Sequence, residues 1–139
     1  MAANTTPIFT KQGNFVPARL VAANTASDGS GTVYTVVTAA VDGTRVDGVR
    51  FRNSQVTAAA SSAMVHRIFL TDTSGLNPRL IGEVATATAT RSTTAIGATS
   101  IFTFDQPIIM KSGQLMTVCQ SVYASAADQF DATAFAGDY

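Results

Sequence analysis

Alternation is the feature of this 139-residue sequence that most restricts its fold. Val, Ile, Phe and Thr recur at every second position in short runs, and Gly, Asn, Asp, Ser and Pro interrupt these runs roughly every 8 to 15 residues. A period of two places successive side chains on opposite faces of a strand, whereas a helix needs a period near 3.6. The sequence therefore predicts an all-β fold.

Eight strands are expected, at residues 15–22, 32–39, 45–53, 63–71, 79–86, 98–105, 115–122 and 129–136. Short antiparallel strands in this number are typical of a two-sheet sandwich with Greek-key connections, of which the jelly roll is the eight-stranded form. An immunoglobulin-like sandwich is a weaker match, because the chain has no Trp and a single Cys. We predict an eight-stranded antiparallel jelly-roll-like sandwich with an extended N-terminal arm.

Three local predictions follow from the strand patterns. Alternation places Val36 and Val37 on opposite faces of their strand. The Asp47-Gly48 pair shifts the phase of the apolar positions and predicts a β-bulge. Pro107 cannot donate to a sheet ladder, so the strand before it is expected to end there.

The domain organisation is predicted to be an extended arm over residues 1–13 and one sandwich domain over residues 14–139. The arm holds Ile8 and Phe9 among polar residues, and such side chains need a partner surface. No secretion signal is visible in the first twenty residues, and no apolar run approaches the roughly 20 residues of a membrane span. We expect no membrane partner.

Composition argues against electrostatic binding of nucleic acid. Nine Lys and Arg balance nine Asp and Glu, while 23 Ala and 20 Thr supply small, quiet side chains. A nucleic-acid binder needs a clustered excess of cations. Arg50 and Arg52 flank Phe51 and could be read as a base-stacking face, but Asp42 and Asp47 lie nearby in sequence, which favours a solvated outer face or ion pairs between subunits.

Residues with catalytic or metal-binding chemistry are scarce. His66, the one histidine, lies among apolar residues of a predicted strand, which is typical of a core or interface position. Cys119 stands alone and is expected to be a small buried hydrophobic residue. Asp72-Thr73-Ser74-Gly75 carries one residue too many for an aspartic-protease turn and is expected to be a polar hairpin loop. We expect no enzymatic activity, no cofactor and no metal site.

Several motifs resemble a family of small jelly-roll structural proteins encoded with the virion genes of tailed bacteriophages. The resemblance covers about residues 14–139. It rests on turns and strands with sequences NTASDGSGT (24–32), VYTVVTA (33–39), DGTRVD (42–47), RIFLTD (67–72) and AFAGDY (134–139).

The resemblance implies a virion component, and specifically a capsid decoration (cement) protein. Such a protein would be assembled in the host cytoplasm, would lie on the outer capsid surface, and would bind the major capsid protein and copies of itself, with a homotrimer expected. We expect Ile8, Phe9, Phe15, Arg50 and Arg52 to contact the capsid or other subunits. The alternative is a glycan-binding or host-surface module of a tail or fibre, since jelly rolls also serve as lectins.

Overall fold

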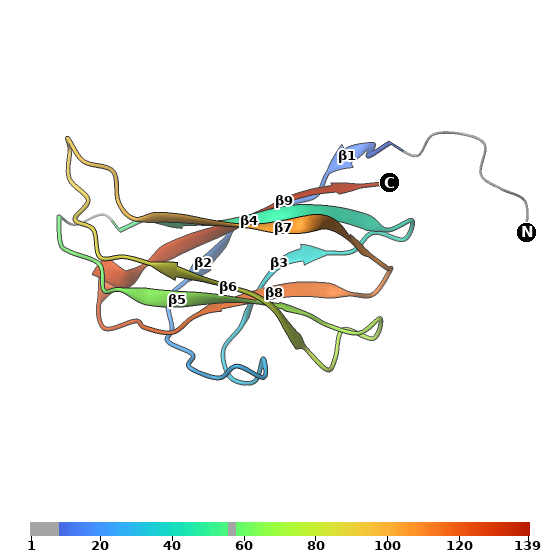
Figure 1. Cartoon of the computed structure of the whole chain (residues 1–139), viewed down its shortest axis with the longest axis horizontal. Helices are drawn as coiled ribbons and strands as arrows, with labels where there is room; N and C mark the ends of the chain where they lie inside the picture. The colour runs from blue at the N-terminus through green and yellow to red at the C-terminus, as the bar shows by residue number, and fades with distance from the viewer. Residues whose placement is uncertain (1–8, 56–57) are drawn as a thin grey trace, which may run out of the picture.

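A computed structural model describes residues 9–55 and 58–139, and these form a sandwich of two antiparallel sheets (Figure 1). The strands in chain order are β1 (Gln12–Gly13), β2 (Ala18–Leu20), β3 (Tyr34–Thr38), β4 (Thr44–Asn53), β5 (Met64–Leu70), β6 (Arg79–Thr86), β7 (Thr99–Met110), β8 (Leu115–Gln120) and β9 (Phe130–Asp138). A short 3-10 helix, η1 (Ala126–Asp128), precedes β9. The all-β prediction is confirmed, and each of the eight expected strands is present, seven of them with different ends and the strand at 79–86 with the expected ones.

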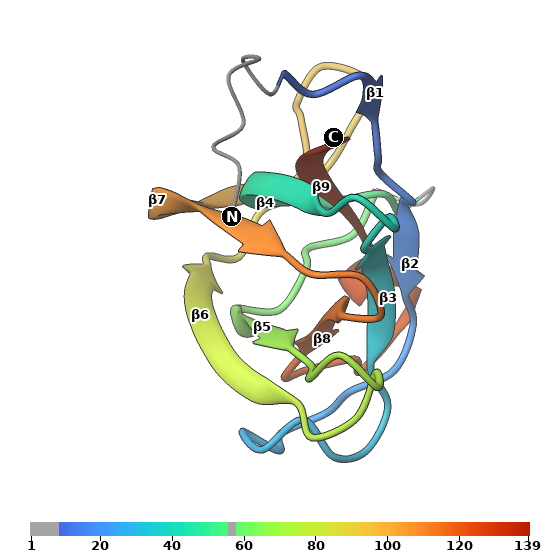
Figure 2. The same ribbon diagram turned by 90° about the vertical axis from the view of Figure 1, so that its right-hand side faces the viewer.

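The order of the strands differs between the two sheets. In the first sheet the order is β9-β4-β7, with β1 and β2 both pairing with the free side of β9. In the second sheet the order is β3-β8-β5-β6. From β2 onward each connection crosses between the sheets except the β5–β6 hairpin, so strands that follow each other in sequence usually lie in opposite layers (Figure 2).

The core lies between the two layers and is made by the alternation seen in the sequence. In β4, for example, Val49 and Phe51 point inward with no exposed surface, while Arg50 and Arg52 point outward. Phe130 from β9 and Ile68 from β5 are also fully buried. Burying a large apolar side chain contributes about 1.5–3 kcal/mol each, so this inner face stabilises the sandwich.

Different contacts close the two sides of the sandwich. On one side, the Phe102 ring of β7 lies over Gly82 of β6, where any side chain would collide with the ring. On the other side, the chain between β1 and β2 leaves β9 and turns to the second sheet, where the Val16 N–H donates to the Val36 carbonyl at 3.2 Å. This turn explains why the expected strand over 15–22 pairs only at Ala18–Leu20.

Sheet pairing begins inside the range predicted to be an arm. The Lys11 N–H donates to the Asp138 carbonyl at 2.7 Å, and Gln12 and Gly13 pair with Asp138 and Gly137. The first eight residues, including Ile8, lie outside the described residues. Within residues 9–13 the chain is therefore partly an edge strand of the first sheet rather than only an extension from it.

Two local predictions are wrong for identifiable reasons. The register between β3 and β8 shifts between Thr35 and Val37, and this irregularity turns both Val36 and Val37 inward with no exposed surface. Strand β7 runs through Pro107 to Met110 instead of ending before it. An edge strand tolerates proline because its outer side has no ladder to supply, and β7 is the last strand of its sheet.

The predicted bulge at Asp47-Gly48 is confirmed. Strand β4 changes register between Val46 and Gly48 against both of its neighbours, β7 and β9. The ion pair between Arg45 and Asp47 (2.8 Å) lies at this bulge on the outer face. The bulge therefore changes which β4 side chains face outward near the C-terminal end of β9.

Candidate interaction surface

The outer faces of the two sheets differ in how much of them the chain itself covers. The β2–β3 connection lies over the second sheet, and there Phe69 and Cys119 have no exposed surface although their side chains point away from the core. Within that connection, the Asn24 amide donates to the carbonyls of Ser30 (2.7 Å) and Thr32 (2.9 Å). The NTASDGSGT motif thus forms a folded cover over one face.

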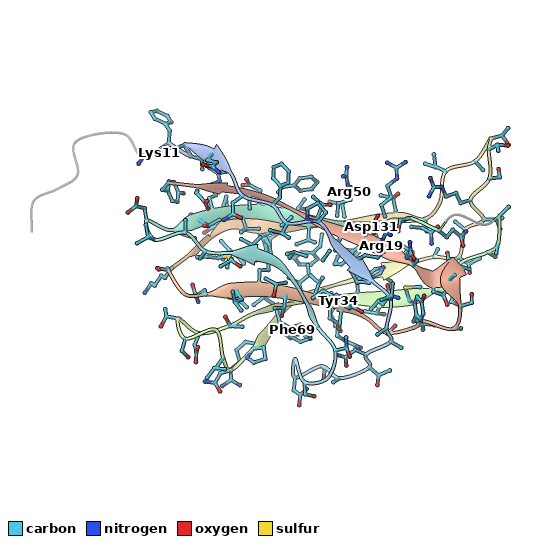
Figure 3. All side chains as sticks on the ribbon, turned by 180° about the vertical axis from the view of Figure 1, so that it is seen from behind. Lys11, Arg19, Tyr34, Arg50, Phe69 and Asp131 are labelled. Carbon is cyan, nitrogen blue, oxygen red and sulfur yellow. The ribbon has the colours of Figure 1, made fainter. Side chains whose placement is uncertain are left out.

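The outer face of the first sheet carries exposed apolar side chains. Ile101 and Ile109 on β7 are 52% and 55% exposed, and Phe135 on β9 is 40% exposed. The arginines of β4 lie between these two strands, because Arg50 pairs with Ile101 on one side and with Thr133 on the other. Figure 3 shows Arg50 projecting from this face and Phe69 on the opposite side of the sandwich.

The structure places three of the five predicted contact residues beside hollows and a fourth apart from them, and does not describe the fifth. Phe15, Arg50 and Arg52 line two hollows on the first sheet's side of the molecule. Phe9 is 75% exposed and lines neither of these hollows. Ile8 belongs to the residues that the structure does not describe.

The larger hollow, of about 610 Å³, lies at the β1 end of β9. Phe15, which is 58% exposed, and Phe135 supply its aromatic walls. The Arg50 guanidinium carbon lies 5.9 Å from the centre of the Phe135 ring, a cation–π geometry. Arg45 also lines this hollow, and its hydrogen bond to Asp47 raises the pKa of the guanidinium above its usual value.

The smaller hollow, of about 280 Å³, shares Arg50 with the larger one. Arg52 and Arg91 also line it, and among the described residues Asp131 is the only acidic one that does. Asp131 lies opposite both Arg19 and Arg52 in the sheet register and is hydrogen-bonded to Arg19 at 3.1 Å (Figure 3). We call Arg50, Arg52, Arg91 and Asp131 the arginine hollow.

Sequence reasoning missed Phe135 and Arg91. The outward position of Phe135 follows from its strand, since Phe130, Ala132 and Ala134 alternate inward and leave the odd-numbered residues outside. Arg91 gave no such signal, because it reaches the hollow from the β6–β7 connection. Its place depends on the path of that loop, where the Arg91 guanidinium donates to the Gln55 carbonyl at 2.9 Å.

His66 is a core residue. Its ring is fully buried, stacks on Phe51 with a centroid distance of 4.3 Å, and lies 4.8 Å from the ring of Phe130. Neither ring nitrogen has a hydrogen-bond partner among the residues the structure describes. Burial lowers its pKa from 6.5 to about 3, so the imidazole is neutral at physiological pH and has no exposed surface with which to contact a substrate.

The acidic turns are engaged with their own backbone. Asp72 accepts hydrogen bonds from the N–H groups of Ser74 (2.9 Å) and Leu76 (3.0 Å) and from the Asn77 amide (2.7 Å). The hydrogen bonds from Ser74 and Asn77 lower its pKa to about 2. Asp28 binds the Ser30 hydroxyl and N–H in the same manner. Asp72-Thr73-Ser74-Gly75 is therefore a self-capped hairpin loop, as predicted.

Cys119 is the single cysteine of the chain, and the β2–β3 connection covers it. Burial raises the pKa of its thiol, and its sulfur lies 3.7 Å from the Asn24 carbonyl oxygen beneath the covering loop. Over residues 9–55 and 58–139, no three His, Cys, Asp or Glu side chains come together as a set of metal ligands.

Comparison with known proteins returned no relative. No protein-family profile, no curated protein and no solved structure matches the chain. Within the described part of the chain, no helix has the length and apolarity to cross a membrane.

Proposed function

We propose that this chain is a bacteriophage virion structural protein, a capsid decoration (cement) protein that binds the outer surface of the major capsid shell and stabilises it. The motif resemblance over residues 14–139 is the starting point. The observation that carries the proposal furthest is the difference between the two faces. One sheet is covered by the protein's own loop, while on the other the partly exposed Arg50 lies beside the exposed Ile101.

The fold is proposed to be a jelly roll. The strand sequences β2-β9-β4-β7 and β3-β8-β5-β6 support this, because successive strands exchange sheets in the manner of two interleaved Greek keys. Local hairpins alone cannot produce such a fold, because most of its neighbouring strands are distant in sequence. It supplies a rigid platform from which exposed side chains can contact a shell.

Firm attachment does not require a large interface from each chain. Contacts of a few kcal/mol per copy add through effective concentration when copies are joined. We propose a homotrimer bound to the shell, with the first sheet's outer face and Phe9 as contact regions. Three copies linked in this way would dissociate only when all their contacts open together.

The copy number in purified particles tests this function. A decoration protein is present in hundreds of copies per particle, whereas a tail component is present in a handful. Quantitative mass spectrometry against the major capsid protein gives this ratio directly. A count of a few copies, or none in particles, would contradict a shell role.

Glycan binding is the second candidate, and the larger hollow is the observation that favours it. Its volume of about 610 Å³ lies in the range of small-ligand sites, and Phe15 and Phe135 give it aromatic walls beside polar groups. Specific, saturable binding on a glycan array, lost on replacing Phe135 by Ala, would rank this function above capsid decoration.

A further inference from the structure

Three of the seven arginines line one hollow, and none of them has a carboxylate at ion-pair distance among the described residues. The described residues form three ion pairs, Arg19–Asp131, Arg45–Asp47 and Arg67–Glu83. None of these pairs includes Arg50, Arg52 or Arg91, although all three lie around the same space of about 280 Å³. In a chain of zero net charge, this is a local excess of positive charge.

The excess is assembled from distant parts of the chain. Arg50 and Arg52 are two residues apart on β4 and so share its outer face. Arg91 arrives from the β6–β7 connection, which rises at one end of the sandwich (Figure 1). The one acidic group in the hollow, Asp131, is already bonded to Arg19. The positive charges of the three guanidinium groups repel one another. An anion that binds between them would offset this repulsion and would be attracted to each of them.

The chemistry of the hollow favours a carboxylate. A guanidinium presents a planar fork of N–H donors that matches a carboxylate with two parallel hydrogen bonds. Apolar side chains adjoin Arg50, since Ile101 of β7 lies opposite it in the sheet register and the centre of the Phe135 ring of β9 lies 5.9 Å from its guanidinium carbon. Such a border suits a protein segment that carries both acidic and apolar side chains.

A long polyanion is a poorer match. Nucleic acid binding draws on many phosphate contacts spread over a basic surface. Here the unpaired arginines occupy one small hollow, and the chain as a whole has no excess of positive charge. Two or three carboxylates are enough to neutralise the site.

We propose that the arginine hollow binds a short acidic segment of another protein, with its carboxylates held by Arg50, Arg52 and Arg91 and its apolar side chains against Ile101 and Phe135. The identification of that protein as the major capsid subunit rests on the proposed function. The binding chemistry itself does not.

An NMR titration tests the site without particles. The isotope-labelled full chain is titrated at low salt with a blocked pentaglutamate peptide, with the matching pentaglutamine peptide, with inorganic phosphate and with a short oligothymidylate. We expect pentaglutamate to shift the side-chain Nε–H signals of Arg50, Arg52 and Arg91 and to bind at least about tenfold more tightly than pentaglutamine, because charge-assisted hydrogen bonds are the stronger kind.

Matched variants locate the binding. The double variant R50Q/R52Q is expected to weaken pentaglutamate binding about tenfold or more. The control R79Q/K111Q removes the same charge from residues that do not line the arginine hollow and should leave binding within about twofold. The amide spectra of both variants verify that they are folded.

Several outcomes would overturn the inference. Equal binding of the two peptides, equal loss in both double variants, or tighter binding of phosphate or oligothymidylate at the same signals would each contradict it. Failure of the proposed function is a separate result, because absence of the protein from particles would leave this titration unchanged. Conversely, a flat titration would leave the copy number in particles unaffected.

Discussion

At the scale of single residues, His66 is a titratable group that folding buries completely. On folding, its imidazole leaves water and packs between the rings of Phe51 and Phe130. It has no hydrogen-bond partner among the described residues. Such a position stabilises the fold through ring stacking and apolar contact, at the cost of desolvating two ring nitrogens. That cost makes the core sensitive to acid.

We predict that His66 makes stability fall as pH decreases from neutrality. Below its unfolded pKa of 6.5 the unfolded chain takes up a proton, whereas the folded chain does not until about pH 3. Protons therefore favour unfolding throughout this window, by roughly 1.4 kcal/mol for each pH unit. Between pH 7 and pH 5 the loss amounts to about 2 kcal/mol.

Urea unfolding of the natural chain and of His66→Leu at pH 7 and pH 5 measures this effect. The two proteins share every carboxylate, so the difference between their pH responses isolates the histidine. The variant should lose about 2 kcal/mol less than the natural chain over this interval. Identical pH responses would show that the imidazole is not desolvated as described.

At the scale of elements, the bulge in β4 depends on Gly48. A methyl group there would fall on the Phe102 carbonyl oxygen of β7 and approach the Thr103 Cα at 3.2 Å. Backbone cannot yield as a flexible side chain can, so Gly48→Ala would force β4 and β7 apart. We predict a destabilisation of about 2–4 kcal/mol, measured by thermal or urea unfolding.

Gly75→Ala is the matched control. That glycine has a φ of +76°, but a methyl group there would make only ordinary contact, at 3.5 Å from Leu115. Its cost should be near 1 kcal/mol, which reflects backbone conformation alone. If the two variants lost equal stability, close packing of β4 on β7 would not explain the glycine at position 48.

The strands themselves were predictable from alternation and turn residues, because each depends on local pattern. The ends of Arg79–Thr86 match the prediction, and the phase shift at Asp47-Gly48 was visible in the sequence. The inward turn of both Val36 and Val37 was not, since a bulge without glycine leaves no mark. The continuation of β7 through Pro107 was not predictable either, because the position of a strand at the sheet edge depends on the whole sheet.

The candidate surface was predictable only in part. Arg50 and Arg52 had to face outward once Val49 and Phe51 faced inward. Their meeting with Arg91 and Phe135 depends on a loop path and on the pairing of β4 with β9, two elements about 80 residues apart. Long-range placement of this kind has no local sequence signal.

At the scale of the whole molecule, deletion of the first residues tests whether they attach the protein to capsids. Removal of residues 1–13, the predicted arm, would also remove β1 and its hydrogen bonds to β9. Removal of residues 1–10 leaves β1 in place, takes away Ile8 and Phe9, and is the cleaner experiment. We predict a stably folded domain that no longer cosediments with capsids lacking the natural protein.

Circular dichroism and thermal unfolding verify the fold of the shortened chain. Its melting temperature should stay within a few degrees of the full chain's, because the paired strands are retained. Full binding to capsids by this variant would exclude Ile8 and Phe9 as anchors. Replacement of Phe9 alone by Ser offers an intermediate case, with weakened binding expected.

The pairing of β1 with the last residues of β9 also has a mechanical consequence. Gln12 lies beside Asp138, so tension applied between Lys11 and Tyr139 pulls two neighbouring antiparallel strands apart from one end. In that geometry the hydrogen bonds break one after another, and the first step needs little force. Tension applied through the arginines of β4 instead reaches a strand paired on both sides, with β7 and with β9. The molecule should therefore yield easily at its joined ends and resist at the middle of its first sheet.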